Sequence, residues 1–254
     1  KIFNAQLNIE ATQTSPQQAV AFKTGDYVKM TPTSTSYTIT TAMTGYDTDQ
    51  IINPSELNLW RVISINSDGT IDLVSEYASS TDVYFKGKIG YQNYITSLNT
   101  IASQYTNSKY TVGTRHMGYN GQTGTITDTS ALDSTTAPFA GDEAKGGGDM
   151  GYQKDFDLVN SVLGTIAANK TGTITSASYW TASRHFNYVS STYWSFCGRY
   201  VDILGSLSIS GLYGYDSGSF STVDNSHAIR PIITLKSGLS PSGSGTSSLP
   251  YVLS

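Results

Sequence analysis

The side chains best suited to catalysis or metal binding are few and scattered along the 254-residue chain. Its three histidines, His116, His185 and His227, form no pair four residues apart and lack a companion cysteine cluster, so the sequence predicts no zinc site. The single cysteine, Cys197, excludes an intrachain disulfide and has no obvious base beside it. No Gly-x-Ser-x-Gly elbow or phosphate-binding loop occurs. We therefore expect a protein that is not an enzyme, with no cofactor and no bound metal.

One segment, residues 183–227, has a composition suited to recognition. It is dominated by Ser, Tyr, Phe and Gly, and it contains no Lys, Glu, Gln or Met, although about six would be expected from their frequency elsewhere in the chain. Tyr supplies rigid contact area, and Ser, Gly and Asn supply adaptable hydrogen bonds, as in antibody paratopes. The alternative is that the segment forms core, as its apolar residues around Ile203 suggest. We favour a binding surface, and the predicted ligand contacts are Arg184, His185, Phe186, Asn187, Tyr188, Tyr193, Phe196, Arg199, Tyr213, Tyr215, Asp216, Phe220, Asp224 and Asn225.

Strands on both sides of this segment must hold it in place. Apolar residues and β-formers at 179–182 and 228–235 predict a strand at each end. Alternating patterns predict further strands at 26–30 and 36–40. Residues 57–65 and 70–75 predict a hairpin around Asn66-Ser67-Asp68-Gly69, with Trp60 in the core.

Two helices are predicted from apolar residues that recur on one face, over residues 93–108 and 155–169. The long polar stretch between them includes Asp142, Glu143 and Asp149, which lack the spacing of a calcium loop, so we interpret them as solvated charges. The Ser- and Gly-rich residues 237–248 resemble a linker, followed by a short closing strand.

Composition and charge limit the possible partners. Charged residues make up 13% of the chain and the net charge is −4, which argues against nucleic acid as a partner. Lys and Arg form no run that would bind an anionic membrane surface. The chain starts abruptly at Lys1-Ile2-Phe3, so we expect residues 1–21 to be an arm or the remnant of a trimmed anchor. Membrane attachment is expected only through such an anchor.

Residues 179–236 carry a resemblance to a known family. The run Tyr179-Trp180-Thr181-Ala182-Ser183, the Ser/Gly/Tyr-rich segment and the run Ala228-Ile229-Arg230-Pro231-Ile232-Ile233 resemble the C-type-lectin-like fold of bacterial and phage proteins. The sequence is similar in particular to the variable proteins of diversity-generating retroelements. Related domains include formylglycine-generating-enzyme-like and pilin-like surface proteins of gut Firmicutes.

The resemblance implies a hypervariable binding face. Such retroelements rewrite adenines in Asn-type codons, which cannot yield Lys, Glu, Gln, Met or Trp. The first four are missing from residues 183–227, and Trp194 is then a fixed scaffold residue. The calcium motifs of sugar-binding lectins are absent, so calcium-dependent sugar binding is not implied. Formylglycine-generating enzymes need active-site cysteines, and one cysteine argues against that activity.

We therefore predict an α+β, C-type-lectin-like fold, with two helices packed on small twisted antiparallel sheets and an N-terminal β extension. Residues 22–254 are expected to form a single domain. The predicted function is non-catalytic binding of a protein or cell-surface ligand, outside a bacterial cell or on a phage particle. The alternatives are a structural surface or pilus subunit and a formylglycine-generating or carbohydrate-active enzyme. The ligand and the oligomeric state stay open.

Overall fold

The computed structural model describes residues 22–114, 132, 178–190, 192–203 and 206–253, and these residues are mostly β. They form four sheets, two α-helices and one short 3-10 helix. In chain order the elements are β1 (Tyr27–Lys29), β2 (Tyr37–Ile39), α1 (Thr41–Thr44), β3 (Gln50–Ile52), η1 (Pro54–Glu56), β4 (Leu59–Ile65), β5 (Ile71–Ser75), β6 (Val83–Lys86), α2 (Gly87–Ser103), β7 (Thr111–Thr114), β8 (Tyr179–Ser190), β9 (Tyr193–Val201), β10 (Leu207–Asp216), β11 (Ser219–Thr222), β12 (Asp224–His227), β13 (Ile232–Leu235) and β14 (Tyr251–Val252).

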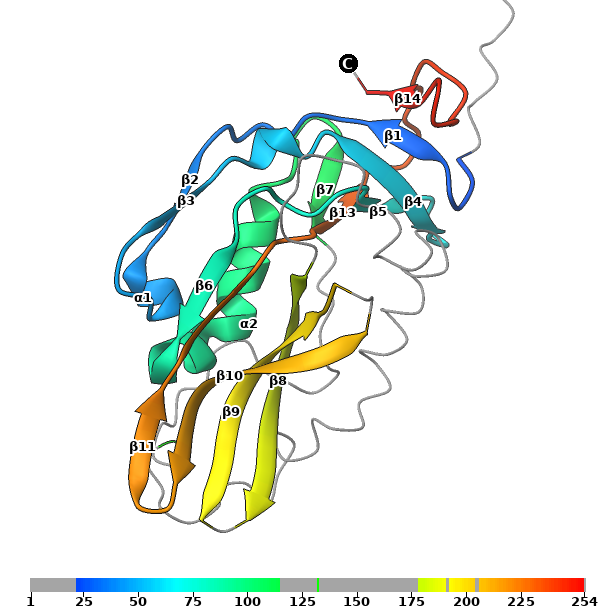
Figure 1. Cartoon of the computed structure of the whole chain (residues 1–254). Coiled ribbons are helices and arrows are strands. Elements are labelled where there is room, and N and C mark those ends of the chain that lie inside the picture. The colour runs from blue at the N-terminus through cyan, green and yellow to red at the C-terminus, as the bar shows by residue number, and fades with distance from the viewer. Residues whose placement is uncertain (1–21, 115–131, 133–177, 191, 204–205, 254) are drawn as a thin grey trace, which may run out of the picture.

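A six-stranded sheet occupies one pole of the molecule, in the strand order β14-β1-β4-β5-β13-β7 (Figure 1). Its β4–β5 hairpin places Val62 opposite Leu73, and the connecting turn contains Gly69 at a φ of 81°, a conformation that favours glycine. The predicted hairpin is confirmed. The predicted burial of Trp60 is also confirmed, and its indole N–H donates to the carbonyl of Met30 at 2.8 Å.

A four-stranded antiparallel sheet, in the order β11-β10-β9-β8, lies at the other pole (Figure 1). Three of its strands are long, with twelve residues in β8, nine in β9 and ten in β10. The ladder shifts register between Thr181 and Arg184 and between Gly211 and Tyr213. Such bulges break the alternation of side chains between the two faces, which explains why the sequence here shows no regular period.

Helix α2 packs against one face of the four-stranded sheet. The rings of Tyr91 and Phe196 lie 4.7 Å apart, and the Tyr94 hydroxyl donates to the carbonyl of Arg199 at 2.8 Å. Gly198 provides the space for this contact, because a Cβ there would lie 2.6 Å from the Tyr94 ring. The helix and the sheet are therefore in close contact at Gly198, where a larger residue would not fit without movement of Tyr94.

The predicted helix over residues 93–108 exists but runs from Gly87 to Ser103. Its buried stripe, with Leu98 and Ile101, is the one that the sequence spacing predicts. The first turn was missed because glycine is a poor helix former. The structure explains Gly90, since a Cβ at this residue would lie 2.6 Å from the carbonyl oxygen of Thr44.

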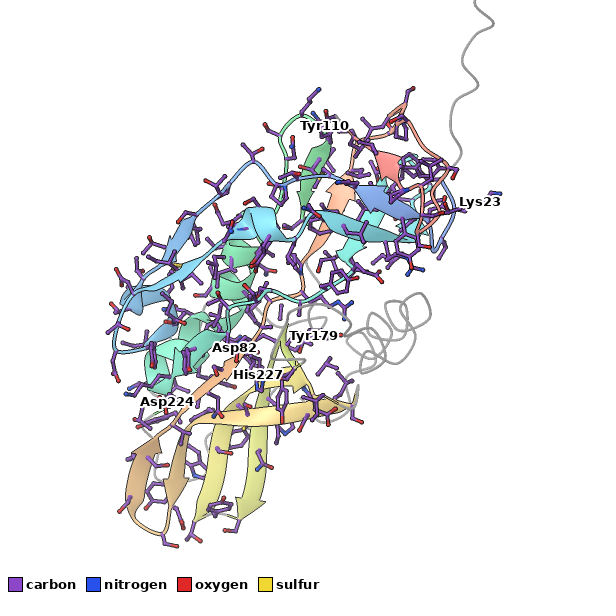
Figure 2. All side chains as sticks on the ribbon, turned by 45° about the horizontal axis from the view of Figure 1, so that its top comes forward. Lys23, Asp82, Tyr110, Tyr179, Asp224 and His227 are labelled. Atoms are coloured by element: carbon purple, nitrogen blue, oxygen red, sulfur yellow. The ribbon has the colours of Figure 1, made fainter. Side chains whose placement is uncertain are left out.

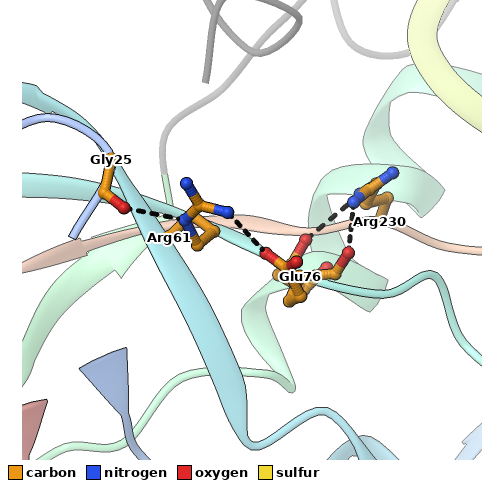
Figure 3. Close-up of polar contacts among 5 residues, drawn as sticks. Gly25, Arg61, Glu76 and Arg230 are labelled. Atoms are coloured by element: carbon orange, nitrogen blue, oxygen red, sulfur yellow. Dashed lines mark hydrogen bonds and ion pairs between the residues drawn. The ribbon is translucent and has the colours of Figure 1, made fainter. Parts of the chain in front are cut away.

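Polar contacts join segments that are distant in sequence (Figure 3). A guanidinium nitrogen of Arg61 lies 3.3 Å from the Glu76 carboxylate, and Arg61 Nε donates to the carbonyl of Gly25 at 2.9 Å. Arg230 donates to the backbone carbonyls of Ser75 and Glu76. Glu76 is buried, so its ion pair with Arg61 satisfies a charge that would otherwise be costly to bury.

The C-terminal residues 237–253 fold back onto the six-stranded sheet. The N–H of Tyr27 donates to the carbonyl of Gly245 at 2.8 Å, and Tyr251 is buried beside Phe22. The prediction of a linker over residues 237–248 is wrong, because glycines here form tight turns instead of a flexible chain. The predicted closing strand is confirmed as β14.

The predicted α+β, C-type-lectin-like fold is wrong. Strands in four sheets make up most of the regular secondary structure of the described residues, and α2 is the one helix among them longer than four residues. The physical reason is that β-branched and aromatic residues fill long extended strands, so sheets organise the chain. The predicted helix over 155–169, the N-terminal arm over 1–21, and Asp142, Glu143 and Asp149 lie outside the described residues. No helix in the described ranges is long and apolar enough to span a membrane.

Candidate functional site

The four-stranded sheet holds most of the residues predicted to bind a ligand and sorts them onto its two faces. Phe186 is paired with Phe196 across β8 and β9, and Phe196 with Tyr213 across β9 and β10. Directly opposed residues point to the same face, so this row belongs to an aromatic face. The next row, with Asn187 paired with Ser195, points to the opposite, polar face.

The predicted exposure of Arg184, Phe186 and Phe196 is wrong, because the exposed fractions of these residues are 0, 3 and 0%. The Arg184 guanidinium donates to the carbonyl of Gln92 in α2 at 3.2 Å and lies 5.6 Å from the centre of the Tyr91 ring. A buried arginine requires such partners. These side chains attach the helix to the sheet, and they contribute almost no exposed surface.

The remaining aromatic residues form a stack of rings across β9, β10 and β11. The rings of Phe196, Tyr213 and Phe220 are nearly parallel, with interplanar angles of 7° and 6° and centroid separations of 6.2 and 5.5 Å. Beside them Trp194, which is buried, stacks on Tyr215 at 5.6 Å. Tyr213 and Tyr215 are partly exposed, and the stack ends at Phe220, which is 40% exposed on an edge strand.

Three of the predicted contacts, Tyr193, Asp216 and Phe220, lie at the free end of the sheet and are exposed. We call these three residues the distal rim. The turns that flank it are joined by a hydrogen bond from the N–H of Ser217 to the carbonyl of Thr192, at 2.8 Å. Tyr193 and Asp216 are directly opposed on β9 and β10. The rim therefore combines side chains from two hairpin ends: Tyr193 and Asp216 point to the polar face, and Phe220, opposite Tyr215, points to the aromatic face.

The distal rim lies at the opposite end of the molecule from the first and last described residues. Lys23 and the C-terminal strand β14 are both at the pole of the six-stranded sheet, whereas the hairpin turns of the four-stranded sheet are at the other pole (Figures 1 and 2). The two ends of the described chain are therefore on the far side of the molecule from the rim.

Asp224 and Asn225 are not part of the rim, although the sequence places them in the same segment. They belong to β12, which pairs with β6, so Asp224 is opposite Lys86 (Figure 2). The side-chain amide of Asn225 donates to the carbonyl of Gly211 at 2.6 Å. These two residues connect the two halves of the fold. Of Tyr188, the structure describes the backbone, in β8 opposite Trp194.

The polar face carries a cluster around Cys197. A guanidinium nitrogen of Arg199 donates to Nδ1 of His185 at 3.1 Å, which fixes the proton of a neutral imidazole on the other nitrogen. His185 is directly opposite Cys197. Burial raises the pKa of the Cys197 thiol, and the hydroxyl of Ser195 lowers it to a smaller extent. The thiol is therefore a poor nucleophile. Arg199 is only 9% exposed, so its prediction as an exposed contact is wrong.

His227 is a well-positioned polar side chain to which sequence reasoning assigned no role. Its ring nitrogens lie 2.7 Å from the Ser178 hydroxyl and 3.0 Å from the Ser210 hydroxyl. The ring stacks on Tyr200 at 3.8 Å and meets the edge of Trp180 at 4.3 Å. No sequence pattern could identify this cluster, because it combines residues from β8, β9, β10 and β12.

The surroundings of His227 do not suit catalysis. Burial lowers its pKa to about 4, which makes it a weak base at neutral pH. Its contact with Ser210 has the geometry of a nucleophile and base, but its other nitrogen contacts Ser178 where a triad would have a carboxylate. We therefore interpret His227 as a bridge between Ser178, which directly precedes β8, and Ser210 in β10.

The described residues contain no group of three or more His, Cys, Asp or Glu side chains that could hold a metal ion. Comparison with known proteins adds no further assignment: no family model matches the sequence, and neither a curated protein nor a solved structure matches it. Among the predicted contacts with described side chains in the four-stranded sheet, the exposed ones are those of the distal rim.

Proposed function

We propose that the distal rim binds a protein or a cell-surface ligand and that the protein does so without catalysing a reaction. The observation that carries this proposal is the exposure of Tyr193 and Phe220, at 46% and 40%, at the same end of the sheet as Asp216. The Asp216 carboxylate is exposed and belongs to neither salt bridge of the described residues. Exposed aromatic side chains grouped with polar ones are typical of the energetic centres of interfaces. The position of the rim, far from both ends of the described chain, supports display toward a partner.

The stack of rings beneath the rim supports the same proposal. Phe220 contacts both Tyr213 and Tyr215, and Tyr215 rests on the buried Trp194. These contacts restrict the rotamer of Phe220 before a ligand arrives. Less conformational entropy is then lost on binding, which increases the affinity that a small surface can achieve.

Two further observations support a role without catalysis. The thiol of Cys197 is buried with a raised pKa, and the imidazole of His227 has a pKa of about 4. Neither group has the pKa of an effective nucleophile or base at neutral pH. We place the protein outside a bacterial cell or on a phage particle, a proposal supported by its low content of charged residues and its abundance of Ser, Thr, Gly and Tyr.

The proposal is tested by panning a random peptide library, displayed on phage, against the full chain. Enriched clones should lose at least about tenfold in affinity for the triple variant Tyr193→Ala, Asp216→Ala, Phe220→Ala. Since all three side chains are exposed, the thermal midpoint of this variant should stay within about 3 °C of the native value.

The matched control is the double variant Ile51→Ala, Ile65→Ala, which also removes exposed apolar side chains, with exposed fractions of 64 and 49%, but away from the rim. Clones should bind this variant as they bind the native protein. Clones that bind the rim variant undiminished, or a library that yields no specific clone, would overturn the proposal.

A further inference from the structure

We propose that the edge of β11 away from β10, which pairs with no other described strand, binds an extended peptide strand that carries an aromatic residue followed by Lys or Arg. This inference rests on the proposed function, because it names the kind of partner that the distal rim would take. β11 forms one edge of the four-stranded sheet, and all four of its residues are exposed (Figure 1). Its sequence, Ser-Phe-Ser-Thr, lacks the Lys or Pro residues that commonly protect an edge strand from pairing.

The register of the hairpin shows which backbone groups of β11 are available. A two-residue turn, Ser217-Gly218, joins β10 to β11, so Asp216 and Ser219 are the hydrogen-bonded pair that closes the hairpin. Hydrogen-bonded and non-hydrogen-bonded pairs then alternate along the ladder. The N–H and C=O groups of Phe220 and Thr222 therefore point away from β10. A strand added in antiparallel orientation would pair with these groups.

The added strand would also extend the stack of rings. A residue paired with Phe220 places its side chain on the aromatic face, next to the exposed side of the Phe220 ring. The rings of Phe196, Tyr213 and Phe220 already follow one another across three strands. A Tyr, Phe or Trp of the partner would be the fourth ring in this series.

The negative charge of Asp216 favours Lys or Arg as the peptide residue that follows the aromatic one. The residue that follows the aromatic one would be opposite Ser219, on the polar face and in the same row as Asp216. Ser219 is small, so a long Lys or Arg side chain can reach across it to the exposed carboxylate. Asp216 is exposed, and it belongs to neither salt bridge of the described residues, which join Arg61 to Glu76 and Lys86 to Asp47.

The size of the edge favours a peptide over a second folded copy of this chain. A stable interface between folded proteins buries at least about 1,200 Å². Four residues of one strand cannot provide that area unless neighbouring surfaces also fit. An extended peptide needs only main-chain hydrogen bonds and one or two side-chain contacts, as in known cases of strand addition.

The test uses the hexapeptide acetyl-Thr-Ser-Tyr-Lys-Ser-Gly-amide, in which Tyr is designed to pair with Phe220 and Lys with Ser219. Titration into the ¹⁵N-labelled full chain should shift the backbone amide signals of Phe220 and Thr222. A peptide N-methylated at Tyr loses an inter-strand hydrogen bond and should bind about tenfold more weakly. Replacing the Tyr of the peptide with Ala, or its Lys with Glu, should weaken binding about threefold.

Two protein variants provide the controls. Phe220→Ala should weaken binding about threefold, whereas Ile51→Ala, at an exposed apolar residue outside the four-stranded sheet, should leave it unchanged. The N-methylated peptide requires no change in the protein, so its result is independent of folding defects. Equal affinity of the N-methylated and unmodified peptides, or shifts that exclude β11, would overturn the inference.

The two proposals fail in different ways. Library clones that require Tyr193 and Asp216 but leave the β11 amides unshifted would overturn strand addition and leave rim binding supported. Binding of the hexapeptide at β11, together with a library that yields no rim-dependent clone, would overturn the proposed function and retain the edge as a peptide site.

Discussion

At the scale of single residues, the fold depends on polar side chains that the sequence presents as surface groups. Arg184 sits among Tyr, Phe and Ser residues in the sequence, yet its side chain is completely buried against α2. The imidazole of His227 likewise joins Ser178, just before β8, to Ser210 in β10. Both cases have the same cause: partners from distant segments satisfy the polar atoms, and a single sequence contains no sign of such long-range pairing.

The pKa of His227 makes a prediction about acid stability. The folded pKa of about 4 is below the ordinary value of 6.5, so between these values the unfolded chain binds the proton more tightly. The free energy of unfolding should therefore decrease as the pH falls from 6.5 to 4, by up to about 2 kcal/mol after allowance for partial exposure. Urea unfolding at pH 7.0, 5.5 and about 4.5 measures this loss.

Other groups also titrate in this range, so the contribution of His227 must be isolated. The variant His227→Gln keeps a polar side chain but does not titrate. The loss of stability on acidification should be smaller in this variant than in the native protein. The same loss in both proteins would show that the burial of His227 is not linked to acid stability.

At the scale of elements, the sequence predicts features that depend on neighbouring residues, such as turns and helix faces. It does not predict which face of a long strand packs against a distant helix. The β4–β5 hairpin follows from its turn residues, and the buried stripe of α2 follows from the helical spacing of its apolar residues. The faces of β8 and β10 were not predictable, because bulges at Thr181/Arg184 and Gly211/Tyr213 change which side chains point toward α2. Three of the predicted site residues form the rim, whereas Arg184, Phe186, Phe196 and Arg199 are buried.

The contact between α2 and the four-stranded sheet predicts the effect of a small change. Gly198→Ala would place a methyl group 2.6 Å from the Tyr94 ring, so the helix or the ring must move. Overpacking of this kind should lower the free energy of unfolding by about 2–3 kcal/mol, measured by urea denaturation.

Gly211→Ala is the matched control for this prediction. It lies on the adjacent strand of the same sheet, opposite Cys197, and a Cβ there would have no neighbour within 4 Å. Its free energy of unfolding should change by less than about 1 kcal/mol. Equal effects of the two substitutions would mean that the close approach of Tyr94 does not limit residue size at Gly198.

At the scale of the whole molecule, the C-terminal residues complete the six-stranded sheet. Tyr251 is 8% exposed and packs on Phe22, and the N–H of Leu253 donates to the carbonyl of Lys29 at 3.0 Å. Truncation after Ser237 would remove these contacts and expose the edge of β1. We expect the free energy of unfolding to fall by about 3 kcal/mol.

Thermal and urea unfolding of the truncated chain would measure this effect. The control for the truncation is a full-length variant in which the exposed Ser247 and Ser248 are replaced by Ala. This variant alters the same segment without removing a buried group. Truncation with no loss of stability would indicate that residues 237–248 act as the linker that their composition suggests.

The pairing of β14 with β1 also determines how the molecule responds to force. The two strands are parallel neighbours, one entered from the start of the described chain and the other leading to its end. A pull applied between these ends would draw the two strands past each other in opposite directions along their length. The hydrogen bonds between them would then be loaded together in shear, instead of being opened one at a time.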